Sequence, residues 1–117
     1  MERDVMEYDV VVVGGGPSGL STAIKFAQMN KENGTDYSIC LLEKGSEIGA
    51  HILSGNVFQT TALDELIPNW KDLNAPVNVP VKKDKLLFLL KKISIPIPAF
   101  IMPTMNNHGN YVISLGN

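Results

Sequence analysis

The sequence predicts an α/β fold built around one βαβ unit, with additional β-hairpin and loop segments that leave the sheet incomplete. A β-branched apolar run over residues 8–13 stops at three consecutive glycines, and a second apolar run over residues 37–42 leads into Glu43. The segment between the two runs has helical spacing. A strand, a tight glycine turn, a helix and a second strand within about 35 residues are typical of a βαβ unit. We place this core at about residues 8–43.

The first strand is apolar on both faces, which predicts a central parallel strand covered by helices on both sides. Pro17 suits the first position of a helix because its missing N–H would have no intrahelical partner there. Apolar residues then recur at three- and four-residue spacing, which predicts a helix over about residues 17–30 before the Asn33-Gly34 turn. The apolar stripe consists of Leu20, Ala23, Ile24 and Ala27.

After Glu43 the chain changes character, since six of its seven prolines lie there. Residues 61–67 predict a short helix, with Thr60 or Thr61 as N-cap. Residues 85–90 and 93–97 predict two strands in a hairpin, and the prolines restrict the second to a sheet edge. Residues 111–115 are expected to form another short extended segment.

The glycine turn has the pattern G-x-G-x-x-G directly between a strand and a helix, which is typical of a Rossmann-like FAD/NAD(P)-binding unit. Gly14 permits the tight turn, Gly16 allows a pyrophosphate to approach the backbone, and Gly19 lets the helix pack closely on the strand. Pro17 and Ser18 open a helix whose N–H groups and dipole attract phosphate.

Glu43 completes the dinucleotide-binding pattern. It follows Gly19 by 24 residues and ends the second strand, where a carboxylate accepts hydrogen bonds from ribose hydroxyls. A carboxylate there suits FAD or NAD and argues against a 2′-phosphate. The position of the glycine turn at the N-terminus, followed by a glycine-rich loop, favours FAD.

The composition argues against several other classes of function. The net charge of −2 offers no basic surplus for nucleic acid. Cys40 is the single cysteine, so this chain makes no internal disulfide and holds no zinc ion or iron–sulfur cluster by itself. No apolar run is long enough for a transmembrane helix.

Several segments carry a resemblance to a known family. The segment 43–55, Glu-Lys-Gly-Ser-Glu-Ile-Gly-Ala-His-Ile-Leu-Ser-Gly, closely resembles the one that follows the FAD fingerprint in electron transfer flavoprotein–ubiquinone oxidoreductases. Residues 66–71, 75–80 and 105–111 resemble further segments of that family in the same order. Two features depart from the pattern: residues 85–103 are less distinctive, and Ser18 replaces a common alanine.

The resemblance implies an enzyme that takes electrons from reduced electron transfer flavoprotein and passes them through FAD and a [4Fe–4S] cluster to ubiquinone. It implies peripheral association with a membrane, the cytoplasmic face of the bacterial inner membrane or the mitochondrial inner membrane. The family's cluster cysteines lie in a C-terminal portion without counterpart here. We therefore expect residues 1–117 to be the N-terminal part of an FAD-binding domain, inactive alone.

Two other functions remain open. One is a related FAD-dependent reductase or monooxygenase of the geranylgeranyl-reductase-like group, which shares the glycine turn and lacks the cluster. The other is a non-catalytic FAD-binding fragment.

The resemblance extends the candidate cofactor site beyond the glycine turn. For His51, contact with the cofactor and a loop role satisfied by backbone groups remain open. In residues 57–70, membrane contact and packing against the FAD domain are likewise open, whereas a structural turn is favoured for His108 and Asn110. The candidate cofactor-binding residues are Gly14, Gly16, Pro17, Ser18, Gly19, Glu43, Lys44, His51, Ser54 and Gly55; the catalytic residues stay unknown.

Overall fold

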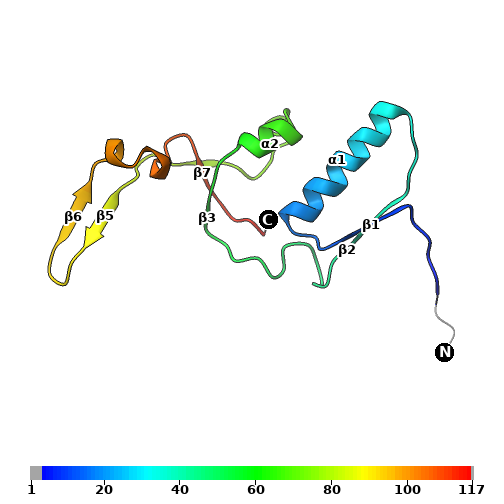
Figure 1. The fold of residues 1–117 in the computed structure, drawn as a ribbon, viewed down its shortest axis with the longest axis horizontal. Helices are drawn as coiled ribbons and strands as arrows, with labels where there is room; N and C mark the ends of the chain where they lie inside the picture. Colours follow the sequence, from blue (N-terminus) through cyan, green and yellow to red (C-terminus); the bar gives the residue numbers. More distant parts are fainter. Residues whose placement is uncertain (1–3, 117) are drawn as a thin grey trace.

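The computed structural model describes residues 4–116 and confirms the α/β fold class. Strand β1 (Val10–Val13), helix α1 (Pro17–Asn33) and strand β2 (Ile39–Leu42) form the predicted βαβ unit. The molecule is elongated, 66 × 39 × 23 Å, with this unit at one end and a hairpin at the other (Figure 1).

Strands β1 and β2 are parallel, with Val10 opposite Ile39 and Val13 opposite Leu42. Each begins two residues later than predicted. The reason lies just before the ladder, where Asp9 Oδ2 accepts hydrogen bonds from both the backbone N and the Oγ of Ser38, each at 2.7 Å. Side-chain bonds replace the ladder there, so residues 8 and 9 and residues 37 and 38 precede the paired strands.

The structure contradicts the prediction that helices cover both faces of this small sheet. Helix α1 packs on β1 and β2 from one side. On the opposite face, Val11 is 50% exposed and Val13 is 82% exposed. Among the described residues only α1 covers the two strands. One apolar face of β1 is therefore covered, and the other is exposed.

Helix α1 continues to Asn33, three residues beyond the predicted end. Gly34 stops it by adopting a left-handed conformation, φ 66°, and its N–H donates to the carbonyl of Asn30. A glycine at this position tolerates a backbone conformation that strains other residues, so the Asn33-Gly34 turn sets the helix end.

A second sheet joins distant segments. Its antiparallel strands are β3 (Asn56–Phe58), β7 (Tyr111–Ile113) and β4 (Val79–Pro80), in that order. Strand β7 was predicted as residues 111–115 and is shorter, while β3 and β4 were missed. Strands of two or three residues show no alternation that a sequence pattern could detect.

Trp70 is the one buried large apolar side chain of the described residues, 4% exposed. It follows helix α2 (Thr61–Leu66), which has the predicted N-cap Thr60 without a side-chain cap bond. Trp70 Nε1 donates to Asp64 Oδ1 at 2.7 Å, and its ring meets Tyr111 edge-on at 6.2 Å. The enclosed ring favours packing for Trp70, one of the two alternatives that the sequence leaves open for this segment. Phe58, Leu63, Leu66 and Ile67 are also partly buried, which favours packing for this segment.

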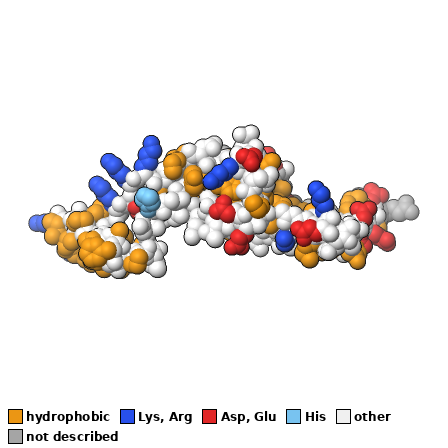
Figure 2. All heavy atoms as spheres, turned by 90° about the horizontal axis from the view of Figure 1, so that it is seen from above, with side chains coloured by type: hydrophobic (Ala, Val, Ile, Leu, Met, Phe, Trp, Pro, Cys, Tyr) orange, Lys and Arg blue, Asp and Glu red, His pale blue; other side chains and the backbone are white. Residues whose placement is uncertain are grey.

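The predicted hairpin is present at the far end of the molecule. Strands β5 (Leu86–Leu89) and β6 (Ser94–Ile97) pair antiparallel, and Leu90 N donates to Ile93 O across the Lys91-Lys92 turn. Two short 3-10 helices follow, η1 (Ala99–Ile101) and η2 (Pro103–Met105). Hydrophobic side chains gather over this end (Figure 2). Those at least 40% exposed are Leu87, Phe88, Leu89, Leu90, Ile93, Ile95, Phe100, Ile101, Met102 and Met105.

Candidate functional site

The glycine turn connects the end of β1 to the start of α1. Gly14 has φ 104°, a conformation that glycine adopts without strain, and its N–H donates to Leu42 O at 2.7 Å. The turn thereby extends the β1–β2 pairing by one bond before the chain bends into the helix at Pro17. Gly14 thus forms the tight turn at the end of β1.

Gly19 and Gly16 differ in their surroundings. A Cβ on Gly19 would lie 1.9 Å from the carbonyl oxygen of Gly14, so helix and strand approach too closely for any side chain there. A Cβ on Gly16 would meet nothing within 4 Å. Gly19 therefore serves packing, while the space in front of Gly16 is open to a ligand.

The N-terminus of α1 is not capped by a side chain. Gly16 is the N-cap residue, and its carbonyl accepts from Leu20 N at 2.9 Å. Among the described residues the amides of Ser18 and Gly19 have no hydrogen-bond acceptor, and the first turn contains no acidic residue. Free N–H groups at the positive end of a helix dipole attract an anion.

Glu43 faces the glycine turn from the end of β2. Its Oε2 accepts from Gly15 N and its Oε1 from Gly45 N, each at 2.7 Å. The Gly45 and Gly15 amides hold the pKa of Glu43 below its usual range, and the charge of His51 contributes a little in the same direction. The carboxylate is therefore anionic at neutral pH and is aimed at the turn.

Sequence reasoning missed Gly15, which occupies a variable position of the motif. Gly15 is buried, and a Cβ on it would lie 2.9 Å from Glu43 Oε2. A glycine there thus allows the bond to Glu43. The run of three consecutive glycines, of which the G-x-G pattern requires only the first and the last, was the available signal.

The loop after Glu43 is tied to the C-terminal segment. Gly49 has φ 89°, and a Cβ on it would lie 2.5 Å from Gly116 O. Ser54 Oγ donates to Ser114 Oγ at 3.1 Å. Two independent contacts thus hold residues 49–54 against residues 114–116, close to the glycine turn in the ribbon (Figure 1).

Of the other predicted residues of this loop, Lys44 and His51 lie close to Glu43. Lys44 and His51 are exposed, and His51 Nδ1 lies beside Gly45, 3.3 Å from where a Cβ on that glycine would be. Gly55, with φ 85°, leads into β3. His51 is thus grouped with Glu43, whereas Ser54 turns toward Ser114.

The Asn106–Tyr111 segment forms a turn away from this loop. Asn110 N donates to Asn107 O at 3.0 Å, and His108 N donates to Asn106 Oδ1 at 3.0 Å. These local bonds agree with the structural turn that was favoured for His108 and Asn110.

Comparison with known proteins agrees with this geometry. Residues 12–74 match the family described as "NAD(P)-binding Rossmann-like domain", a span that includes the glycine turn, α1, β2 and Glu43.

The chain belongs to the NAD(P)-binding Rossmann-like domain family.

Curated relatives confirm the resemblance to electron transfer flavoprotein–ubiquinone oxidoreductases. The chain is 57% identical to the "Probable electron transfer flavoprotein-ubiquinone oxidoreductase" of Acinetobacter baylyi, covering 100% of this chain and 21% of the relative. It is 55% identical to the Pseudomonas aeruginosa enzyme, covering 100% and 22%. It is 49% identical to the mitochondrial enzyme of Mus musculus, covering 100% and 19%. The chain thus spans about a fifth of the length of these relatives.

Residues 4–116 show neither a metal-binding cluster nor a membrane-spanning helix. These residues contain no group of three or more His, Cys, Asp or Glu placed to hold a metal ion. None of the helices that they form has the length and apolar character needed to cross a bilayer.

Proposed function

We propose that this chain forms the FAD-binding wall of an oxidoreductase that takes electrons from reduced electron transfer flavoprotein and delivers them to ubiquinone. The observation that carries the proposal is the 55–57% identity, over the whole chain, to proteins with that name. The geometry of the glycine turn supports it, because the turn leaves room for a dinucleotide.

The residues of the turn fit FAD. The open space at Gly16 and the unpaired amides of Ser18 and Gly19 suit a pyrophosphate. Each Glu43 oxygen uses one lone pair on a backbone amide and keeps another for a ribose hydroxyl. When bound, FAD supplies the redox chemistry, and these residues bind and orient it.

The loop after β2 completes this proposed wall. Lys44 and His51 flank Glu43, so either side chain is placed to approach the adenosine half of the cofactor. Ser54 and Gly55 are proposed to contribute backbone groups, since the Ser54 hydroxyl is already bonded to Ser114. These four roles rest on the resemblance together with the position of the loop.

The [4Fe–4S] cluster of the resemblance does not fit this chain. Such a cluster is held by four cysteine thiolates, and Cys40 is the single cysteine. Cys40 is half-buried in β2, opposite Val11. We therefore assign no electron-transfer step through a cluster to these residues.

Ubiquinone reduction tests the proposal. The full-length protein, loaded with FAD, is mixed with reduced electron transfer flavoprotein and a soluble ubiquinone analogue. Two electrons and two protons should convert each quinone to quinol, and omission of the flavoprotein should abolish the reaction. Quinone reduction that proceeds equally with an unrelated electron donor would contradict the assigned partner. No reduction with any donor would contradict the assigned reaction.

Peripheral membrane association is proposed to run through the β5–β6 end of the molecule rather than residues 57–70. The exposed apolar side chains gather there, including Leu89, 72% exposed, and Phe100, 82% exposed. The lysine pair Lys91-Lys92 lies at the hairpin turn. Exposed apolar residues beside lysines are typical of surfaces that bind a membrane interface.

Sedimentation with neutral phosphatidylcholine vesicles tests this surface. In the full-length protein, Phe88→Ser with Leu89→Ser should reduce vesicle binding at least tenfold, since each change removes an exposed apolar group. Met29→Ser with Leu73→Ser is the matched control, because both residues are exposed and lie outside the hairpin. Equal binding by the two double variants would contradict the proposed surface.

A further inference from the structure

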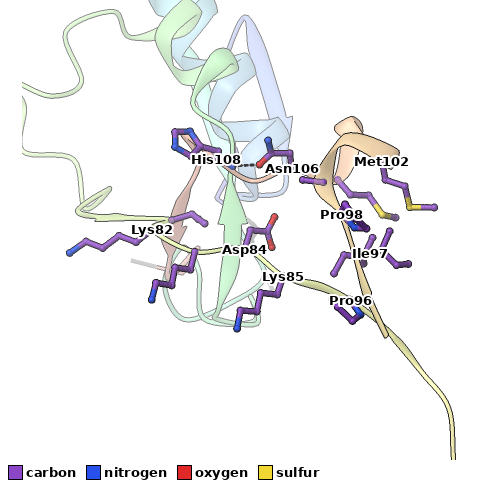
Figure 3. A pocket seen from close by; sticks show the side chains of 14 residues that line it. Lys82, Asp84, Lys85, Pro96, Ile97, Pro98, Met102, Asn106 and His108 are labelled. Carbon is purple, nitrogen blue, oxygen red and sulfur yellow. Dashed lines mark hydrogen bonds between the residues drawn. The ribbon is translucent and has the colours of Figure 1, made fainter. Parts of the chain in front are cut away.

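A pocket lies at the base of the hairpin, away from the glycine turn. Its volume is about 480 Å³, in the range of small-ligand sites. It is formed by the segment that enters β5, the end of β6, the two 3-10 helices and the turn before β7 (Figure 3). The dinucleotide site described above uses none of these residues.

The two sides of the pocket differ in chemistry. Ile97, Pro98 and Met102 lie on one side, and Lys82 and Lys85 lie on the other (Figure 3). The apolar side continues into the exposed apolar residues at this end of the molecule, since Met102 belongs to both groups. A ligand that fills this pocket therefore meets cations at one end and apolar surface at the other.

The charge of the lining is positive. Three lysines, Lys82, Lys83 and Lys85, stand against one acid, Asp84. Asp84 Oδ2 is engaged by Asn107, accepting from its backbone N at 2.9 Å and from its Nδ2 at 3.0 Å. Asp84 thus bonds to the turn before β7, while the three lysines are exposed.

We propose that this pocket binds the headgroup of an anionic phospholipid, with the phosphate among the lysines and the glycerol end against the prolines and methionines. The proposal rests on the membrane association proposed above. A hairpin whose apolar end enters the interface would bring its base to the depth of the headgroups, where basic residues attract anionic lipid. A free phosphate would leave the apolar side unused.

Vesicle binding at constant ionic strength tests the proposal with the full-length protein. Neutral phosphatidylcholine vesicles are compared with vesicles that contain 30% phosphatidylglycerol. The wild type should bind the anionic vesicles more tightly. Lys82→Gln with Lys85→Gln should lower that affinity on the order of tenfold or more and leave neutral binding unchanged, since each lysine near an anionic surface contributes about 1 kcal/mol.

Two further variants separate a pocket from general charge attraction. Lys25→Gln with Lys31→Gln removes the same charge from exposed positions of α1 and should change the anionic affinity less than about twofold, because these residues lie far from the hairpin in the ribbon. Ala99→Phe fills the pocket without changing charge and should also abolish the preference for anionic vesicles.

The outcomes that overturn the proposal are distinct. Equal losses in the two lysine double variants would indicate bulk electrostatics and no site. If Ala99→Phe keeps the full preference for anionic vesicles, the pocket does not bind the headgroup. If inorganic phosphate competes fully for binding, the site recognises a simple anion and not a phospholipid. Neutral binding without any anionic preference would overturn the headgroup site alone, whereas no binding to any vesicle would overturn both the site and the membrane association.

Discussion

The carboxylate of Glu43 accepts a hydrogen bond from the buried amide of Gly15 at 2.7 Å, across 28 residues of sequence. This bond connects the end of β2 to the glycine turn after β1. The residue proposed to bind ribose is therefore also a structural partner of the loop proposed to bind pyrophosphate. Loss of the carboxylate should therefore affect both roles.

Glu43→Gln should destabilise the protein in a pH-dependent manner. The two amides lower the pKa of Glu43 in the folded state, so its contribution to stability is present above the unfolded pKa, near 4.5, and is lost as pH falls through the folded pKa. The difference in Tm between wild type and Glu43→Gln should be largest at pH 7 and should shrink toward pH 3.

Glu47→Gln is the matched control, because Glu47 is exposed and its side chain makes no hydrogen bond within the described residues. It should give no such trend. A Tm difference for Glu43→Gln that stays constant from pH 7 to pH 3 would show that the ionised carboxylate is not what the amides stabilise.

Gly19→Ala should lower the free energy of unfolding by about 2–3 kcal/mol or more, because the new Cβ would lie 1.9 Å from the Gly14 carbonyl oxygen. Neither atom can move away unless the backbone shifts. Urea denaturation of the apoprotein measures it. Gly16→Ala, where the Cβ meets open space, should cost roughly 1 kcal/mol through its weaker N-cap propensity. Equal losses in the two variants would contradict the different roles of these glycines.

Trp70→Ala should cost about 3–5 kcal/mol, because it removes the enclosed ring that packs on Tyr111. Trp70→Phe should cost less, since it keeps an aromatic ring and loses the bond to Asp64. Trp70 is the single tryptophan of residues 1–117, so the fluorescence lost on Trp70→Phe reports its environment, and a blue-shifted emission maximum is expected. Emission typical of a water-exposed indole would contradict the burial of Trp70.

Gly49→Ala should weaken the contact between the Glu43 loop and the C-terminal segment. The new Cβ would lie 2.5 Å from Gly116 O, in addition to the strain at φ 89°. Gly55→Ala is the control, because Gly55 has a similar φ of 85° and open space around it, so it should cost only about 1–2 kcal/mol. Urea denaturation should find Gly49→Ala the less stable variant, and indistinguishable midpoints would contradict the contact.

The βαβ unit was predictable because its signals are local. The apolar runs, the glycine turn and Pro17 fix two strands and a helix within one short stretch of sequence, and the structure keeps that order. The hairpin was predictable for the same reason, since Lys91-Lys92 separates two apolar runs that pair directly.

The second sheet and the packing of Trp70 depend on contacts between residues that are distant in the sequence. Phe58 pairs with Tyr111 and Val79 with Val112, and neither pair has a periodic pattern to reveal it. The position of Trp70 stays open in the sequence, because an apolar residue beside a short helix suits membrane contact and packing equally well. Only the ring of Tyr111, brought close by β7, distinguishes the two.

The central claim is that the open space at Gly16 receives the pyrophosphate of FAD, and FAD titration of the apoprotein tests it most directly. Full-length wild type and Gly16→Ala are titrated with FAD, and bound flavin is measured by fluorescence quenching after each apoprotein is shown to be folded. The wild type should bind about one FAD per chain, and Gly16→Ala should bind at least tenfold more weakly, because its methyl group blocks close approach to the backbone. Equal FAD affinity in the two proteins, or no FAD binding by the wild type, would contradict the claim.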